Sequence, residues 1–137
     1  MVFAAESVEL IPSFGVSMQD LASLTHRLSA VIRDIPDFPK PGILFKDITP
    51  ILQDAALMRD LTGYWANFYG DQGVELVVGM ESRGFIFGTP LAMALGVGFA
   101  PARKPGKLPY QRVSESYALE YGTATLDMHT DAVKPGQ

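Results

Sequence analysis

The sequence contains no cysteine and only two histidines, and these absences exclude several kinds of site. Without cysteine, the chain forms neither disulfides nor thiolate–metal centres. His26 and His129 stand apart from each other and from any spacing typical of metal ligands, so we expect surface or hairpin residues there. The composition therefore predicts no metal held by the protein itself, and the lack of cysteine favours a cytoplasmic protein.

The chain also lacks charged residues from position 84 to 102, a run of 19 residues that is long enough for a membrane helix. Two prolines and four glycines interrupt this run, so we expect a helix followed by a strand instead of a membrane span. The first 15 residues carry Glu6 and Glu9 but no basic residue, unlike a secretory signal or a transit peptide. We expect residues 1–16 to be a loose extension ahead of one domain, residues 17–137.

Acidic residues are absent from positions 82–114, although the chain as a whole is acidic. The formal net charge is 11 − 15 = −4, which argues against general nucleic-acid binding. Outside this segment, the remaining 104 positions carry 6 cations and all 15 anions. The five cations inside it are Arg83, Arg103, Lys104, Lys107 and Arg112. This basic segment predicts a focused anion site, and the alternative is a solvated loop with a few positive charges.

Residues 74–102 are predicted to form a strand, a helix and a second strand. Apolar runs indicate strands over 74–78 and 97–102. Between them, a helix over 85–95 is expected to end at Gly96. Strands joined in this way are typically parallel neighbours in one sheet, so the segment predicts an α/β fold.

The turn Ser82-Arg83-Gly84 follows the first of these strands and precedes the helix. Ligands of open α/β sheets gather at the carboxyl ends of strands, and helix N-termini there attract anions. Arg83 adds a planar guanidinium that matches phosphate oxygens. The hydrolase motif G-x-S-x-G does not fit, because Gly79 is one residue too far from Ser82, and phosphate-loop and dinucleotide motifs are absent. An anionic ligand is therefore the first functional inference.

Two helices and a proline-rich segment are expected ahead of this unit. An apolar stripe predicts a helix that starts near Ser17, and Asp54 is a suitable cap for a second helix. The second stripe, which we expect in the core, is Leu57, Leu61, Tyr64, Trp65 and Phe68. Residues 35–50 contain four prolines, so we expect an ordered loop that presents Leu44 and Phe45. Phe45 could stack on a flat heterocycle, but a loop tip folded onto the core fits equally well.

A polar loop and a β-hairpin over residues 117–130 are expected to follow the second strand. In its second arm, alternation predicts Leu126 and Met128 on the buried face and Asp127 on the opposite face. Glu120 is a candidate general acid–base, since it lies in this hairpin near the basic segment. The plain alternative is an exposed, solvated glutamate.

Four stretches of the chain resemble adenine phosphoribosyltransferases, in the same order. They are IPDFPKPGILFKDITP (35–50), VVGMESRGFIFG (77–88), ARKPGKLP (102–109) and SYALEYGTATLDMH (116–129). The resemblance implies a type I phosphoribosyltransferase-like α/β fold: a partial parallel sheet with flanking helices, an N-terminal hood loop (35–50) and a core (54–102). A basic loop and a flexible β-hairpin (103–130) complete the expected domain.

This resemblance also implies an activity. Adenine phosphoribosyltransferases transfer the 5-phosphoribosyl group of phosphoribosyl pyrophosphate (PRPP) to adenine, which yields AMP and pyrophosphate in purine salvage. The family is usually homodimeric and uses Mg²⁺, bound mainly through PRPP. The implied partners are therefore adenine, PRPP, AMP, pyrophosphate and a second copy of the chain, without nucleic acid or membrane.

The same resemblance implies roles for individual residues. Leu44 and Lys46 would contact adenine largely through their backbone, and Phe45 would stack on the ring. Glu120 would handle the proton on the purine as N9 attacks, and Tyr121 would close the hairpin over the site.

On the pyrophosphate side, Ser82 and Arg83 would hold the leaving group, with a cis peptide bond between Glu81 and Ser82. The cations that would neutralise the leaving group are Arg103, Lys104 and Lys107. A departing polyanion requires this kind of preorganised positive charge.

Family members continue beyond the Pro-Gly turn at 135–136 into a strand ending in two aspartates and a Thr-Gly-Gly-rich loop. That segment holds the ribose hydroxyls and the 5-phosphate, and the 137 residues stop before it. We therefore expect a partial domain with little or no turnover on its own. The alternative is a non-catalytic module that binds purine or pairs with a full-length subunit.

Overall fold

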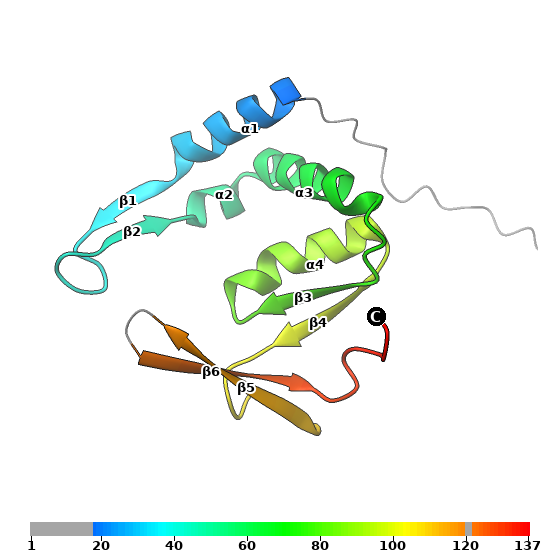
Figure 1. Ribbon diagram of the computed structural model, residues 1–137. Helices are drawn as coiled ribbons and strands as arrows, with labels where there is room; N and C mark the ends of the chain where they lie inside the picture. The colour runs from blue at the N-terminus through cyan, green and yellow to red at the C-terminus, as the bar shows by residue number, and fades with distance from the viewer. Residues whose placement is uncertain (1–17, 120–121) are drawn as a thin grey trace, which may run out of the picture.

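The computed structural model describes residues 18–119 and 122–137 (Figure 1). Three helices are stacked on a small parallel sheet, and two antiparallel hairpins project from this body. The longer helices are α1 (Met18–Val31), α3 (Ala55–Gly70) and α4 (Arg83–Leu95). α1 packs on α3, α3 packs on α4, and α4 covers the parallel sheet. This order of layers confirms the predicted α/β architecture.

The parallel sheet consists of β3 (Leu76–Met80) and β4 (Gly98–Ala102), joined by α4. The predicted strand–helix–strand unit is thus confirmed, with small shifts in its boundaries, of which the one at β4 is a single residue. β3 lies two residues later than expected, and α4 begins at Arg83 instead of residue 85. Gly96 ends the helix with a φ of 70°, a left-handed conformation that favours glycine. The shift makes Ser82 the N-cap and Arg83 the first helical residue.

The core lies between the helices and is built from the predicted stripe of α3. Leu57 and Leu61 pack with Leu24 of α1, and Trp65 contacts Phe87 of α4 edge to face at 5.9 Å. The predicted N-cap of α3 is also confirmed, because the Asp54 side chain accepts hydrogen bonds from the first turn of the helix. One member of the stripe was predicted wrongly: Phe68 is 56% exposed, at the far end of the helix.

Residues 33–47 form an antiparallel hairpin, which we call the hood hairpin. Its strands are β1 (Arg33–Pro36) and β2 (Leu44–Asp47). The prediction of a loop over all of 35–50 is therefore corrected: only 37–43 form a loop between strands. A two-stranded ribbon has no central strand, so Pro36 is tolerated at an edge. The short α2 (Thr49–Gln53) follows, and it accommodates Pro50 in its first turn.

The second hairpin, which we call the C-terminal hairpin, consists of β5 (Arg112–Leu119) and β6 (Gly122–His129). It confirms the predicted hairpin but starts five residues earlier than residue 117. An antiparallel bridge between Arg103 and Asp127 connects β6 to the chain that leaves β4, and Figure 1 shows the hairpin crossing beneath β4. The predicted alternation in β6 was wrong, because Asp127 is the buried residue and its neighbours Leu126 and Met128 are half-buried.

Some predictions fall on residues outside the described part of the chain. These are the loose extension at 1–16 and the two hairpin residues Glu120 and Tyr121. Within residues 18–119 and 122–137, none of the helices combines the length and hydropathy needed to cross a bilayer.

Candidate functional site

The turn between β3 and α4 presents exposed polar groups at the positive end of a helix. The Glu81–Ser82 peptide bond is cis, as the resemblance implied. Ser82 is exposed, and its hydroxyl caps no backbone N–H of the helix. The first turn of α4 contains no acidic residue, so nothing in it offsets the partial positive charge of the helix N-terminus. This turn can therefore receive an anion.

Close packing behind the turn explains two of its glycines. A Cβ atom on Gly79 would lie 2.6 Å from the Phe99 ring and 2.8 Å from the Gly84 carbonyl oxygen. Likewise, a Cβ on Gly84 would lie 3.2 Å from the Gly79 carbonyl carbon. The end of β3 and the start of α4 thus touch backbone to backbone, and no larger residue fits at Gly79 without displacing its neighbours.

Glu81 ties this turn to the basic loop, which we define as residues 103–107. Its backbone N–H donates to the Ala102 carbonyl at 2.8 Å. Its carboxylate accepts from the Lys104 backbone N–H at 3.0 Å and pairs with the Arg103 guanidinium, Nε at 3.3 Å and Nη2 at 3.4 Å. The Lys104 hydrogen bond, followed by the Arg103 interaction, lowers the pKa of Glu81 below its ordinary value. The ends of β3 and β4 are therefore joined through one ionised carboxylate.

The cations of the basic loop fall into two groups. Arg103 is paired with Glu81, donates from Nη1 to the Lys107 carbonyl at 3.1 Å, and lies 5.9 Å from the Phe85 ring centroid. Lys104 and Lys107 are exposed, and no ion pair of residues 18–119 and 122–137 involves either ammonium group. The two lysines thus offer positive charge to an external anion, and Arg103 mainly holds the loop together.

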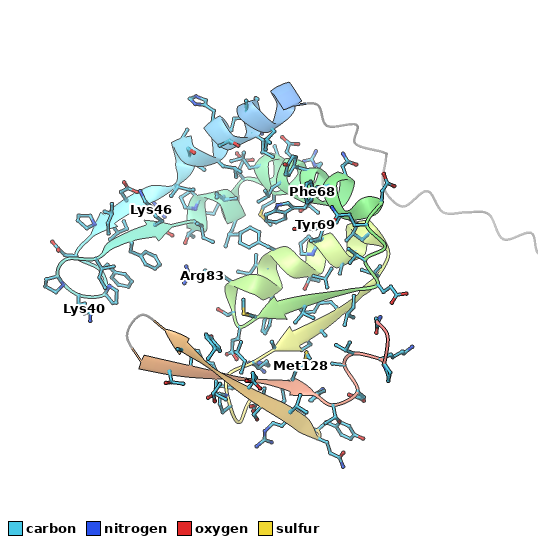
Figure 2. All side chains as sticks on the ribbon, viewed as in Figure 1. Lys40, Lys46, Phe68, Tyr69, Arg83 and Met128 are labelled. Carbon is cyan, nitrogen blue, oxygen red and sulfur yellow. The ribbon has the colours of Figure 1, made fainter. Side chains whose placement is uncertain are left out.

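The hood hairpin meets the turn through Phe45 and Arg83. The Arg83 guanidinium carbon lies 5.6 Å from the Phe45 ring centroid, a cation–π distance, and Figure 2 shows Arg83 in the space between the hairpin and α4. Phe45 also contacts Phe38 edge to face at 5.1 Å. The neighbouring Leu44 and Lys46 lie on the opposite, exposed face of β2, and the Lys46 ammonium pairs with Asp34.

The structure therefore brings together most of the residues singled out from the sequence. Phe45 touches Arg83, and Glu81 connects the turn that holds Ser82 and Arg83 to the basic loop. The side chains of Leu44 and Lys46 lie on the other face of the hairpin from Phe45.

Sequence reasoning missed two carboxylates that organise this region, Glu81 and Asp127. Asp127 is buried between the C-terminal hairpin and the basic loop. For Glu81, the available signal was its position at the end of a strand, beside Ser82. For Asp127, the available signal was an acidic residue opposite a basic segment, but alternation in β6 pointed the other way.

Solved structures share this fold. The crystal structure of adenine phosphoribosyltransferase from Thermoanaerobacter pseudethanolicus superposes with a TM-score of 0.78 at 51% identity, covering 82% of this chain and 65% of that one. The Saccharomyces cerevisiae enzyme, solved with adenine and D-2,5-dideoxy-2,5-imino-altritol 1,6-bisphosphate, gives 0.74 at 38% identity, covering 82% and 66%. The fold is that of the type I phosphoribosyltransferases.

Within the type I phosphoribosyltransferases, the similar sequences are those of adenine phosphoribosyltransferases. The adenine phosphoribosyltransferase of Aeromonas salmonicida is 56% identical over 109 residues, which are 80% of this chain and 60% of that protein. No family model matches the chain. The chain is thus a homologue of adenine phosphoribosyltransferases, and it spans about 60% of the length of the bacterial relatives it matches.

Proposed function

We propose that this chain takes part in transferring the 5-phosphoribosyl group of PRPP to adenine, with AMP and pyrophosphate as products. One observation carries the proposal: Arg83 begins α4 between an aromatic ring of the hood hairpin and a turn tied to the basic loop. The names of the relatives and the adenine-bound yeast structure support the same reaction. A base subsite thereby adjoins an anion subsite.

Pyrophosphate is the proposed ligand of the turn and the basic loop. Ser82 offers an exposed hydroxyl, Arg83 a guanidinium, and α4 its unpaired N–H groups. The ammonium groups of Lys104 and Lys107 add exposed positive charge, and Arg103 contributes a guanidinium already shared with Glu81. These groups would stabilise the negative charge that builds up on the departing pyrophosphate.

Adenine is the proposed ligand of the hood hairpin, stacked on Phe45. The alternative of a hairpin tip folded onto the core is not supported, because Leu44 is 54% exposed and Phe38 is 50% exposed. The backbone of Leu44 and Lys46 would hydrogen-bond the edge of the base. Base–aromatic stacking is worth about 1–3 kcal/mol, so Phe45 would supply much of the affinity.

In the proposed reaction, adenine N9 forms a bond to C1′ of PRPP as the C1′–O bond to pyrophosphate breaks. The electron pair of that bond leaves with pyrophosphate, and the N9 proton passes to the Glu120 carboxylate. Tyr121 would close the hairpin over the site and exclude water. Glu120 and Tyr121 lie outside the described residues, so their roles stay predictions from the resemblance.

Magnesium enters this proposal as a companion of PRPP, whose phosphate oxygens are ligands that Mg²⁺ prefers. Among residues 18–119 and 122–137, no group of three or more His, Cys, Asp or Glu side chains could hold a metal ion. We therefore place magnesium on the phosphate oxygens of PRPP and assign it no step of its own. The homodimer and the cytoplasmic location likewise stay predictions from the resemblance.

Calorimetry with adenine and with pyrophosphate tests the proposal, using the variants Arg83→Ala and Arg59→Ala. Arg59 is an exposed arginine of α3 and serves as the matched control. We expect Arg83→Ala to weaken pyrophosphate binding by about tenfold or more, the value of one lost charge-assisted hydrogen bond, with a smaller change for adenine. We expect Arg59→Ala to leave both affinities unchanged.

Two results would contradict this proposal. An unchanged pyrophosphate affinity in Arg83→Ala would remove Arg83 from the anion site. A chain that binds neither adenine nor pyrophosphate would remove both subsites. Formation of AMP from adenine, PRPP and Mg²⁺ by the 137-residue chain is the further test, and binding of adenine without AMP formation would leave a purine-binding module.

A further inference from the structure

Asp127 lies at the junction of the C-terminal hairpin and the basic loop, and the proposed reaction leaves it without a role. Its side chain is 1% exposed, and it is the one buried charged residue in the described part of the chain. Its Oδ1 accepts from the Ser114 hydroxyl at 2.7 Å, and its Oδ2 lies 3.0 Å from the Arg112 Nε. A buried carboxylate requires such partners, because an unpaired one would cost several kcal/mol.

The third partner of this carboxylate belongs to the basic loop itself. The Gly106 backbone N–H donates to Oδ2 at 3.3 Å, from a residue with a φ of 79°, where the loop turns. The backbone of Asp127 also pairs twice with Arg103, which receives one hydrogen bond at 2.7 Å and donates another at 2.8 Å. One residue of β6 therefore holds both the start and the turn of the basic loop.

The two exposed lysines sit on the backbone that is held in this way. Lys104 is fixed by its own N–H on Glu81, and Lys107 directly follows Gly106. Glu81 after β3 and Asp127 in β6 thus both hold the loop. When the backbone of a cationic loop is fixed before an anion arrives, less conformational freedom is lost on binding.

We propose that Asp127 is a positioning residue for pyrophosphate binding, which acts by fixing the basic loop so that Lys104 and Lys107 face the anion. This inference rests on the proposed function of the loop. Asp127 itself touches no ligand in this scheme. Its effect reaches the anion through the backbone of Gly106 and Arg103.

The sign of the effect separates positioning from simple electrostatics. The Asp127 carboxylate is a negative charge close to an anion site, so on charge alone Asp127→Asn should tighten pyrophosphate binding. Positioning predicts the reverse. Asparagine can still accept from Arg112 and Gly106 and donate to Ser114, but it carries no charge, so the hydrogen bonds that hold the loop lose the charge assistance of the carboxylate. The loop would loosen, and pyrophosphate would bind more weakly although the local charge is more favourable.

The test measures pyrophosphate and adenine binding by calorimetry, and amide hydrogen exchange over residues 103–107, in the wild-type chain, Asp127→Asn and Asp131→Asn. Asp131 is exposed just beyond β6, so its variant has the same charge change without a link to the loop. In Asp127→Asn, we expect loop exchange to accelerate and the pyrophosphate Kd to rise about tenfold, the value of one lost charged hydrogen bond. We expect adenine affinity to stay within about twofold, because the hood hairpin is untouched.

The outcomes distinguish the inference from the proposed function. Pyrophosphate binding that is unchanged or tighter in Asp127→Asn would overturn the positioning role alone. Equal losses for adenine and pyrophosphate would also overturn it, because they would indicate a general loss of the fold. A wild-type chain that binds no pyrophosphate would overturn the proposed function and, with it, this role. In that case, hydrogen exchange would still report whether Asp127 anchors the loop.

Discussion

The two antiparallel hairpins flank the candidate site and are held in different ways. The hood hairpin carries two ion pairs on its surface, Arg33 with Asp47 and Lys46 with Asp34. The C-terminal hairpin instead surrounds the buried carboxylate of Asp127. Exposed ion pairs contribute about 0–1 kcal/mol, whereas removing the shared acceptor of a hydrogen-bonded group around a buried carboxylate costs about 1–3 kcal/mol. The C-terminal hairpin is therefore the more firmly anchored of the two.

Each hairpin also reaches the site by a different kind of contact. The hood hairpin touches α4 through the Phe45 ring and the Arg83 guanidinium, a contact without a fixed hydrogen-bond direction. The C-terminal hairpin reaches the basic loop through directional backbone hydrogen bonds at Gly106 and Arg103. A ring that stacks on a flat base can tolerate small shifts, but a loop that must place charges around an anion cannot. The looser contact thus belongs to the hairpin proposed to bind adenine, and the directional contacts belong to the hairpin that holds the loop proposed to bind pyrophosphate.

The largest effect is expected when the buried anchor is removed. Asp127→Ala would leave Ser114, Arg112 and the Gly106 N–H without their common acceptor. We expect the free energy of unfolding, measured by urea denaturation, to fall by about 1–3 kcal/mol. The exposed control Asp131→Ala is expected to change it by less than about 0.5 kcal/mol. An equal loss of unfolding free energy in Asp127→Ala and Asp131→Ala would show that the buried carboxylate does not anchor the C-terminal hairpin more firmly than surface groups do.

The parts of the fold that were predictable from the sequence are those with a local signal. β3, α4 and β4 follow from apolar runs, from the turn at Ser82-Arg83-Gly84 and from Gly96 at the end of the helix. The N-cap at Asp54 was predictable for the same reason, because its hydrogen bonds reach only two and three residues ahead. Short-range chemistry of this kind can be read directly from residue order.

The parts that were not predictable depend on partners far along the chain. The burial of Asp127 requires Arg112, Ser114 and Gly106, which come from another strand and from a loop. Period-two alternation placed the aspartate outward, and tertiary contacts reversed the expected face. The hood hairpin could not be predicted either. The prolines of 35–50 argue against a central strand, and they give no signal that two short strands pair with each other.

The second largest effect is expected at Phe45, and it separates the two proposed ligands. Phe45→Leu keeps apolar volume but removes the ring, so we expect the adenine Kd to rise about tenfold through lost stacking. Pyrophosphate binding should change less, because the contact with Arg83 is worth only about 0.5–1 kcal/mol. The control is Phe68→Leu, an exposed ring on α3. If calorimetry finds a larger loss of affinity for pyrophosphate than for adenine, it would contradict the assignment of adenine to the hood hairpin and of pyrophosphate to the turn and the basic loop.

A smaller, pH-dependent effect is expected at Glu81. The hydrogen bond from Lys104 and the Arg103 guanidinium hold the pKa of this carboxyl below its ordinary value of 4.5. A carboxylate with a lowered pKa in the folded state stabilises the fold above its unfolded pKa and loses that contribution as the pH falls through the folded pKa. We expect Glu81→Gln to be less stable than the wild type at neutral pH and this difference to shrink below pH 4.5.

Thermal unfolding of both proteins across the acidic range measures this difference. Glu75→Gln, which removes an exposed glutamate just before β3, is the control for the loss of one carboxylate. A difference that grows toward acidic pH would mean that protonated Glu81 is the form that holds the basic loop, against the assignment made from its partners.

The smallest effect is expected at the surface pair of the hood hairpin. Asp34 and Lys46 are both about half exposed, so a double-mutant cycle with Asp34→Asn and Lys46→Met should give a coupling below about 1 kcal/mol that decreases with salt. Because Lys46 is proposed to meet adenine through its backbone, Lys46→Met should also leave the adenine Kd within about twofold. If this coupling energy is as large as the stability loss in Asp127→Ala, the surface ion pair would anchor the hood hairpin as firmly as the buried Asp127 anchors the C-terminal hairpin. A large loss of adenine affinity would instead indicate that the Lys46 ammonium contributes to base binding, and the hood hairpin would then recognise adenine by charge as well as by stacking.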